Sequence, residues 1–273
     1  MKKILKFIAI LVLTMGFVLG TEFLTSSIIS GVLGISGAEA ATNPQALAVI
    51  TKYQIIFGQL LRLCLIFLFF YIRKKKNNRK DISIKYKGLL PDSWKMIVIG
   101  LGVAGLGNYV ISFLLAVIGH IPSVSNTLEQ FNDAFQMSGG LDFLLMIIGV
   151  VILAPISEEI LFRGLVFERL RKIYTLPWAI VLSGLIFGIY HMNILQGINT
   201  FIMGSVLAYV YYYRRNIMDS ILIHIVNNFF ALTVGLNQTL AIVMTVVSTI
   251  AIFISIKYLK DFKVKSKTAC DVF

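Results

Sequence analysis

Long apolar stretches alternate with short polar segments along the chain. Most of these stretches have about the 17–25 residues that a helix needs to cross a bilayer. The pattern therefore predicts an all-α fold, a polytopic bundle of about eight transmembrane helices. The expected spans cover residues 7–20, 46–72, 96–118, 143–172, 177–192, 197–213, 217–234 and 239–258.

The first apolar stretch follows a basic N-terminus, which is also how a cleaved signal peptide begins. Its apolar part is longer than a typical signal-peptide core, and about eighteen residues separate it from the small-residue sequence Ala38-Glu39-Ala40. We therefore expect a first transmembrane helix. The segment from Thr21 to Pro44, which is rich in Ser, Gly and Thr, is expected to be a loop.

The composition supports a membrane protein and excludes a soluble domain with a large core. Hydrophobic residues make up 58% of the 273 positions, charged residues make up 14%, and the mean hydropathy is +0.85. The two cysteines, Cys64 and Cys270, do not have the spacing of a disulfide framework or a zinc knuckle.

The net charge of +12 is interpreted as a topology signal and not as a nucleic-acid site. Of the 25 Lys and Arg residues, 22 fall at the N-terminus, in the segment 73–95, at or just after the inner ends of the fourth and sixth spans, and between Lys257 and Lys267. The other three, Lys52, Arg62 and Arg163, lie within spans, where they should face other helices or extend to the interface. We expect both termini in the cytoplasm and the protein in a bacterial plasma membrane.

The fourth span carries three ionisable residues between Ser157 and Gly164. A charge at the bilayer centre costs about 2.5–3.5 kcal/mol on insertion scales, so the cluster indicates either a buried ion pair or a reaction centre. Glu159 and Arg163 are four residues apart and can pair on one helix face. Glu158 lies about 100° further round the helix, with no basic residue at that spacing, and is the candidate general acid–base group.

Two later spans each carry a histidine. In the fifth span Phe187 and His191 are four residues apart, and in the seventh His224 and Asn228 are four apart, so each pair shares a helix face. A single histidine in a helix is usually a hydrogen-bonded core residue. Two histidines on separate spans, together with a glutamate pair on a third, favour a shared site.

Two further features concern how these helices pack. Pro155 removes a backbone donor, which predicts a distortion of the fourth span near Val151. Gly184 and Gly188 form a G-x-x-x-G step in the fifth span, which lets a neighbouring helix come close.

Taken in order, these motifs resemble those of the CAAX-protease and bacteriocin-processing family of intramembrane endopeptidases (CPBP, also called ABI). Each motif alone is weak, but the three together, with membrane spans around them, are specific. The resemblance covers roughly residues 143–234. The residues that carry it are Glu158-Glu159-x-x-x-Arg163, Phe187-x-x-x-His191 and His224-x-x-x-Asn228.

The resemblance implies hydrolysis of peptide bonds inside the membrane. Its substrates would be peptides or membrane-protein segments, as in CAAX processing or the processing of bacteriocins and leader peptides. By position in the motifs, Glu158 and His191 would activate the attacking water, His224 and Asn228 would stabilise the oxyanion, and Glu159 and Arg163 would brace the site. A general base beside a water, with donors aimed at the developing charge, is the minimum for amide hydrolysis.

The cofactor requirement stays open at this point. Two histidines and one or two glutamates are enough for a zinc site with an open position for water. There is no H-E-x-x-H sequence, so the ligands would come from three helices. The family is often called metalloprotease, while a metal-free glutamate mechanism is also argued for its relatives. The expected enzyme is a glutamate or metalloendopeptidase that uses zinc or no cofactor.

Two other functions use the same residues. An ion-coupled transporter would carry ions on them, although the chain shows no inverted repeat. A non-catalytic immunity protein would bind a toxin peptide. In all three cases the predicted organisation is the same: N-terminal spans and a basic loop (1–95), the main membrane bundle with the motifs at 143–234 (96–258), and a basic cytoplasmic tail (259–273).

Overall fold

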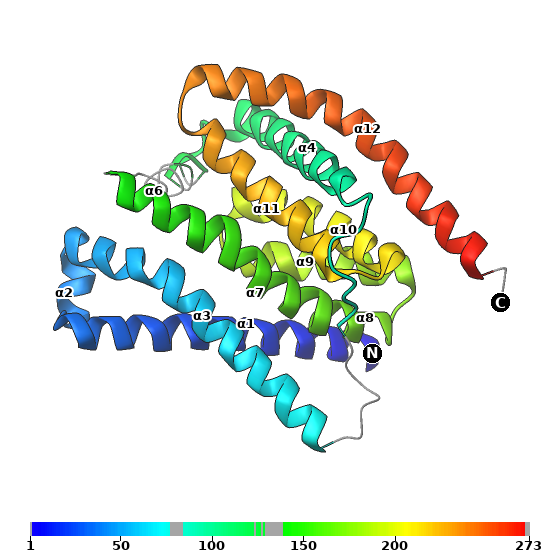
Figure 1. Cartoon of the computed structure of the whole chain (residues 1–273). Coiled ribbons are helices and arrows are strands. Elements are labelled where there is room, and N and C mark those ends of the chain that lie inside the picture. Colours follow the sequence, from blue (N-terminus) through cyan, green and yellow to red (C-terminus); the bar gives the residue numbers. More distant parts are fainter. Residues whose placement is uncertain (1, 77–83, 123, 127, 129–138, 271–273) are drawn as a thin grey trace. The chain divides into compact units, whose positions relative to one another are not determined.

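The structure, a computed structural model, describes residues 2–76, 84–122, 124–126, 128 and 139–270 (Figure 1). Every regular element within these residues is a helix, which confirms the predicted all-α class. The chain divides into two compact units. Unit 1 contains Met1–Ser83 and Met137–Leu161, and unit 2 contains Ile84–Gln136 and Phe162–Phe273.

Unit 1 is built on two long helices, α1 and α3, which pack against each other and are connected through the short α2 (Figure 1). The helical segment that begins at α6 packs against α3. The elements of unit 1 are α1 (Lys2–Leu33), α2 (Gly37–Thr42), α3 (Pro44–Lys76), α6 (Gly140–Met146), the π-helix η1 (Ile147–Leu153) and α7 (Ala154–Leu161).

The loop predicted between Thr21 and Pro44 is wrong, because α1 continues to Leu33 and α2 and α3 follow almost at once. The threonine hydroxyls in this segment bond back to the helix itself. Thr21 donates to the carbonyl of Val18 and Thr25 donates to that of Thr21, each at 2.7 Å. These hydroxyls therefore add to the helical hydrogen bonds, and in an apolar environment the helix is the conformation that satisfies its own backbone groups.

The two cations within α3 face other helices of unit 1, which confirms the prediction for them. Lys52 forms an ion pair with Asp142 of α6. Arg62 forms an ion pair with Glu22 of α1, and the Arg62 side chain is only 1% exposed. An isolated charge is costly in a bilayer, and charged side chains within membrane helices therefore usually pair with one another.

Unit 2 carries the remaining helices. α4 packs against α11 and α12, and α10 packs against α4, α9 and α11 (Figure 1). The elements of unit 2 are α4 (Trp94–Ile118), the π-helix η2 (Phe162–Phe167), α8 (Glu168–Arg171), α9 (Leu176–Tyr190), α10 (Ile194–Arg214), α11 (Ile217–Val234) and α12 (Gln238–Cys270). The predicted basic tail is thus helical as far as Cys270, as a continuation of α12.

Glycines bring α9 and α10 into close contact, as the G-x-x-x-G step predicts. A Cβ atom added at Gly188 would lie 2.6 Å from the carbonyl oxygen of Gly197, and one added at Gly184 would lie 2.7 Å from that of Phe201. Both distances are shorter than the normal contact distance between a carbon atom and a carbonyl oxygen. The backbones of the two helices therefore approach each other only because these positions lack side chains.

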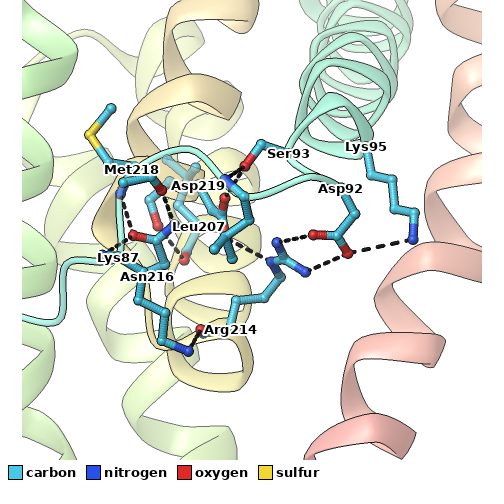
Figure 2. Close-up of polar contacts among 12 residues, drawn as sticks. Lys87, Asp92, Ser93, Lys95, Leu207, Arg214, Asn216, Met218 and Asp219 are labelled. Carbon is cyan, nitrogen blue, oxygen red and sulfur yellow. Dashed lines mark hydrogen bonds and ion pairs between the residues drawn. The ribbon is translucent and has the colours of Figure 1, made fainter.

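A hydrogen-bonded cluster fixes the segment before α4 to the turn between α10 and α11 (Figure 2). Arg214 donates to both carboxylate oxygens of Asp92 at 2.9 and 2.7 Å, and its Nε donates to Asp219 at 2.6 Å. Ser93 also donates to Asp219, which is fully buried. The hydrogen bonds from Arg214 lower the pKa of Asp92 from 3.8 to about 2, against the opposing effect of burial.

Seven helices of the described chain are long and apolar enough to cross a membrane, and α9 is an apolar helix of only 15 residues. At about 1.5 Å per residue α9 is roughly 22 Å long, shorter than a hydrocarbon core of about 30 Å. The protein is a multi-pass membrane protein. The expected eight spans correspond to these seven helices and the shorter α9.

Candidate active site

Glu158 and Glu159 lie next to each other on α7, and both are buried, at 5% and 0% exposure. The distortion expected before them is present as a π-helix. The N–H of Ala154 donates to the carbonyl of Gly149, five residues earlier. This bond lies at the end of the π-helix η1, directly before Pro155. Single π-helical turns are frequent at functional sites because they rotate the side chains that come after them.

Arg163 lies in the second π-helical stretch, η2, and is fully buried. Its Nη1 donates to the hydroxyl of Ser183 on α9 at 3.1 Å and to the carbonyl of Gly204 on α10 at 2.9 Å. One guanidinium therefore ties three helical segments of unit 2 together. The predicted pairing of Arg163 with Glu159 stays a prediction.

The ring of Phe187 on α9 is the centre around which the candidate residues of unit 2 gather. The rings of His191 and His224 stand nearly perpendicular to it, with centroids 5.0 and 5.7 Å away. The Arg163 guanidinium carbon is 5.5 Å from the same centroid. Phe162 packs against the ring at 4.6 Å. The structure thus brings Arg163, His191 and His224 together around one aromatic side chain.

His191 stands at the very end of α9, where the chain turns into α10. Its Nδ1 is 2.9 Å from the carbonyl oxygen of Phe187. The next residue, Met192, has a positive φ of 50°, and Asn193 caps α10 by accepting hydrogen bonds from Leu195 and Gln196. The short turn places the imidazole at the end of α9, where the side chain is half-buried.

His224 and Asn228 lie one turn apart on α11, as the sequence spacing predicts. His224 is almost fully buried, with 1% exposure. The side chain of Asn228 accepts a hydrogen bond of 3.3 Å from the Nδ2 of Asn227. An imidazole and a carboxamide on one helix face provide N–H donors of the kind that stabilise an oxyanion.

Two residues that matter for this cluster were not singled out from the sequence. Ser183 and Gly204 bind Arg163, and the role of the Phe187 ring as the common contact was not foreseen. A serine and a glycine in apolar spans look like ordinary small packing residues. The useful signal was the buried arginine, whose guanidinium needs several acceptors.

No three His, Cys, Asp or Glu side chains gather as a metal site requires in the part of the chain that the structure describes. A zinc ion needs three or four such ligands around one point.

Comparisons with known proteins point to one family. A family model described as type II CAAX prenyl endopeptidase Rce1-like matches residues 140–230. The "Putative membrane peptidase YdiL" of Bacillus subtilis (strain 168) is 34% identical over 92 residues, which cover 34% of this chain and 38% of that protein. The match thus spans well under half of that relative's length. No solved structure matches the chain.

Proposed function

We propose that this membrane protein, whose residues 140–230 match the Rce1-like family model, is an intramembrane endopeptidase of the CPBP family. One observation carries the proposal: a single matched segment contains all six candidate residues. Within unit 2, three of them are also gathered around the Phe187 ring.

The proposed reaction is attack of water on a peptide carbonyl. Glu158, assisted by His191, takes a proton from the water as its oxygen bonds to the carbonyl carbon. His224 and Asn228 donate hydrogen bonds to the oxyanion that forms. The tetrahedral intermediate then breaks its C–N bond, and the proton held by Glu158 passes to the leaving amine. The products are a carboxylate and a free amine.

The remaining two candidates would hold this arrangement in place. Arg163 binds α9 and α10 to its own helix through Ser183 and Gly204, and it contacts the ring that lies against both histidines. Glu159 is fully buried beside the proposed base. We propose bracing roles for both. The proposed substrates are peptides or membrane-protein segments that reach the site within the bilayer.

Substitution of the proposed base tests this function. Glu158→Gln keeps the size of the side chain but cannot accept the water's proton, so cleavage of a quenched fluorescent peptide library should fall by about 10²–10⁴-fold. His191→Ala should have a similar effect. Glu168→Gln is the matched control, because Glu168 lies on the same membrane span but pairs with Arg171 at its end. The control should cleave normally.

The same assay separates the alternatives. Cleavage that persists in Glu158→Gln would refute the proposed mechanism. Cleavage lost on addition of a zinc chelator would assign a metalloenzyme, and cleavage unaffected by it would favour the glutamate mechanism. Ion-coupled uptake in liposomes, without proteolysis, would assign a transporter instead. Protection of cells from a toxin peptide by the Glu158→Gln variant would support the immunity function.

A further inference from the structure

A chain of polar contacts crosses unit 1 from α1 to α7, outside the candidate residues described above. Arg62 of α3 pairs with Glu22 of α1 and donates from Nη1 to the side-chain oxygen of Gln59 at 3.2 Å. The hydroxyl of Ser157 on α7 donates to the same oxygen at 2.5 Å. Gln54 also donates to Glu22. Glu22, Arg62, Gln59 and Ser157 thus form one continuous path, called here the polar chain.

An ion pair that merely joins α1 to α3 needs only Glu22 and Arg62. The arm from Arg62 through Gln59 to Ser157 adds two more polar groups in an apolar setting, where such groups are costly and usually functional. Arg62 also fixes which way the Gln59 amide points, because a guanidinium can only donate and so selects the amide oxygen. That oxygen is then the acceptor that Ser157 meets.

Ser157, the last residue of the polar chain, is the sequence neighbour of the proposed base, Glu158. Ser157 immediately precedes Glu158 on α7, so the two side chains are about 100° apart around the helix axis. A hydrogen bond that fixes the direction of Ser157 toward α3 therefore also fixes the direction in which Glu158 points.

α7 needs such an external contact. It is only eight residues long, and π-helical stretches precede and follow it, at Ile147–Leu153 and Phe162–Phe167. In these stretches the backbone hydrogen bonds shift from the α to the π pattern, so the rotation of α7 is not dictated by one continuous α-helix. Gly149 of η1 also packs closely against Ile55 of α3.

We infer that the polar chain is a positioning device that sets the rotation of α7 and thereby orients the Glu158 carboxylate. This inference rests on the proposed function of Glu158. It assigns a part in catalysis to α1 and α3, which lie outside the matched segment. The residues of the polar chain do not touch the reacting atoms. They act through the direction of the proposed base.

Removing the bond between Gln59 and Ser157 tests the inference. Gln59→Met and Ser157→Ala each delete one partner at little change in volume. Misorientation of a catalytic group costs up to about a hundredfold, so each variant should lose between about tenfold and a hundredfold in kcat with KM unchanged. The double variant should lose no more than the worse single variant, because both changes remove one interaction. Thr51→Val on α3 is the control, since its hydroxyl donates to the Leu47 carbonyl of the same helix.

A second readout does not depend on turnover. A hydrophobic carbodiimide modifies intramembrane carboxyl groups, and peptide mapping by mass spectrometry gives the rate at Glu158. This rate should change in Gln59→Met and Ser157→Ala and stay at the wild-type value in Thr51→Val. Melting temperatures in detergent show whether a variant has merely unfolded. If Gln59→Met does not fold, Ser157→Ala deletes the same bond with a smaller change and decides alone.

The outcomes separate this inference from the proposed function. If Glu158→Gln is inactive while Gln59→Met and Ser157→Ala keep wild-type kcat and wild-type labelling, the positioning role is refuted and the proposed base stands. If the losses of the two single variants multiply in the double variant, the two residues act independently and the polar chain is also refuted. If Glu158→Gln cleaves normally, the proposed function itself fails.

Discussion

Phe187 has no polar atom in its side chain, yet its ring contacts three of the residues that carry the proposed chemistry. It lies against two imidazoles and one guanidinium. An aromatic ring fixes the spacing of such groups without offering them a hydrogen bond, so the nitrogen atoms stay available for other partners. At the residue scale, the site therefore depends on an apolar side chain as well as on the polar ones.

Asp92 gives a prediction about acid stability. Its pKa is lowered from 3.8 to about 2 in the folded protein, so the ionised carboxylate contributes stability that is present above about pH 4. That contribution is lost as the pH falls from about 4 to about 2. The melting temperature of wild type in detergent should therefore fall more steeply over this window than that of Asp92→Asn, whose side chain does not titrate.

Asp261→Asn is the control for this measurement, because Asp261 is an exposed residue of α12 and is not one of the two carboxylates that bind Arg214. It should keep the wild-type dependence on pH. Equal slopes for wild type and Asp92→Asn would show that the ion pair with Arg214 does not stabilise the fold.

At the scale of elements, the short apolar helix α9 packs closely against α10. α9 has 15 residues, and its glycines allow the backbone of α10 to approach until their atoms are in contact. Arg163 then joins both helices from η2. Since His191 ends α9, the position of that imidazole is determined by the contact between α9 and α10.

Gly188→Ala tests this packing. Its Cβ would lie 2.6 Å from the Gly197 carbonyl oxygen, so the helices must separate. Overpacking of this kind costs about 1–3 kcal/mol, and the melting temperature in detergent should fall accordingly. Gly235→Ala, at the end of α11 in the same unit, is the control because its Cβ would meet only ordinary contacts at 3.6 Å. An equal melting temperature for the two variants would show that α9 and α10 do not need the glycine contact.

At the scale of the whole molecule, the basic residues define the expected orientation. If the seven long apolar helices and the shorter α9 all cross, both ends of the chain are expected on the side where Lys and Arg are concentrated. The turn between α11 and α12 is then expected on the opposite side, and the end of α3 on the cytoplasmic side.

Thiol labelling in whole cells tests this orientation. In a background with Cys64 and Cys270 replaced by serine, Asn237→Cys should react with a membrane-impermeant reagent in intact cells. Lys74→Cys should react only after the membrane is made permeable, because it belongs to the basic cytoplasmic segment. The reverse pattern would invert the topology, and labelling of both positions in intact cells would mean that an even number of crossings separates them.

The sequence by itself determined the helices, the membrane location and the pairs of residues on common helix faces. These follow from local rules: apolar length specifies a span, and a spacing of four residues specifies one face. The extent of α1 was mispredicted because Ser, Gly and Thr favour loops in water, whereas in this helix the threonine hydroxyls bond to their own backbone.

Only the tertiary structure decided which side chains meet. That Ser183 and Gly204 bind Arg163, and that Ser157 binds Gln59, depends on residues 20 to 98 positions apart in the chain. Serine, glutamine and backbone carbonyls give no sequence signal of their own, because each forms hydrogen bonds with whatever partner packing supplies. Which partner a side chain meets depends on how neighbouring helices are rotated and how closely they approach. Both result from the packing of side chains over the entire helix face.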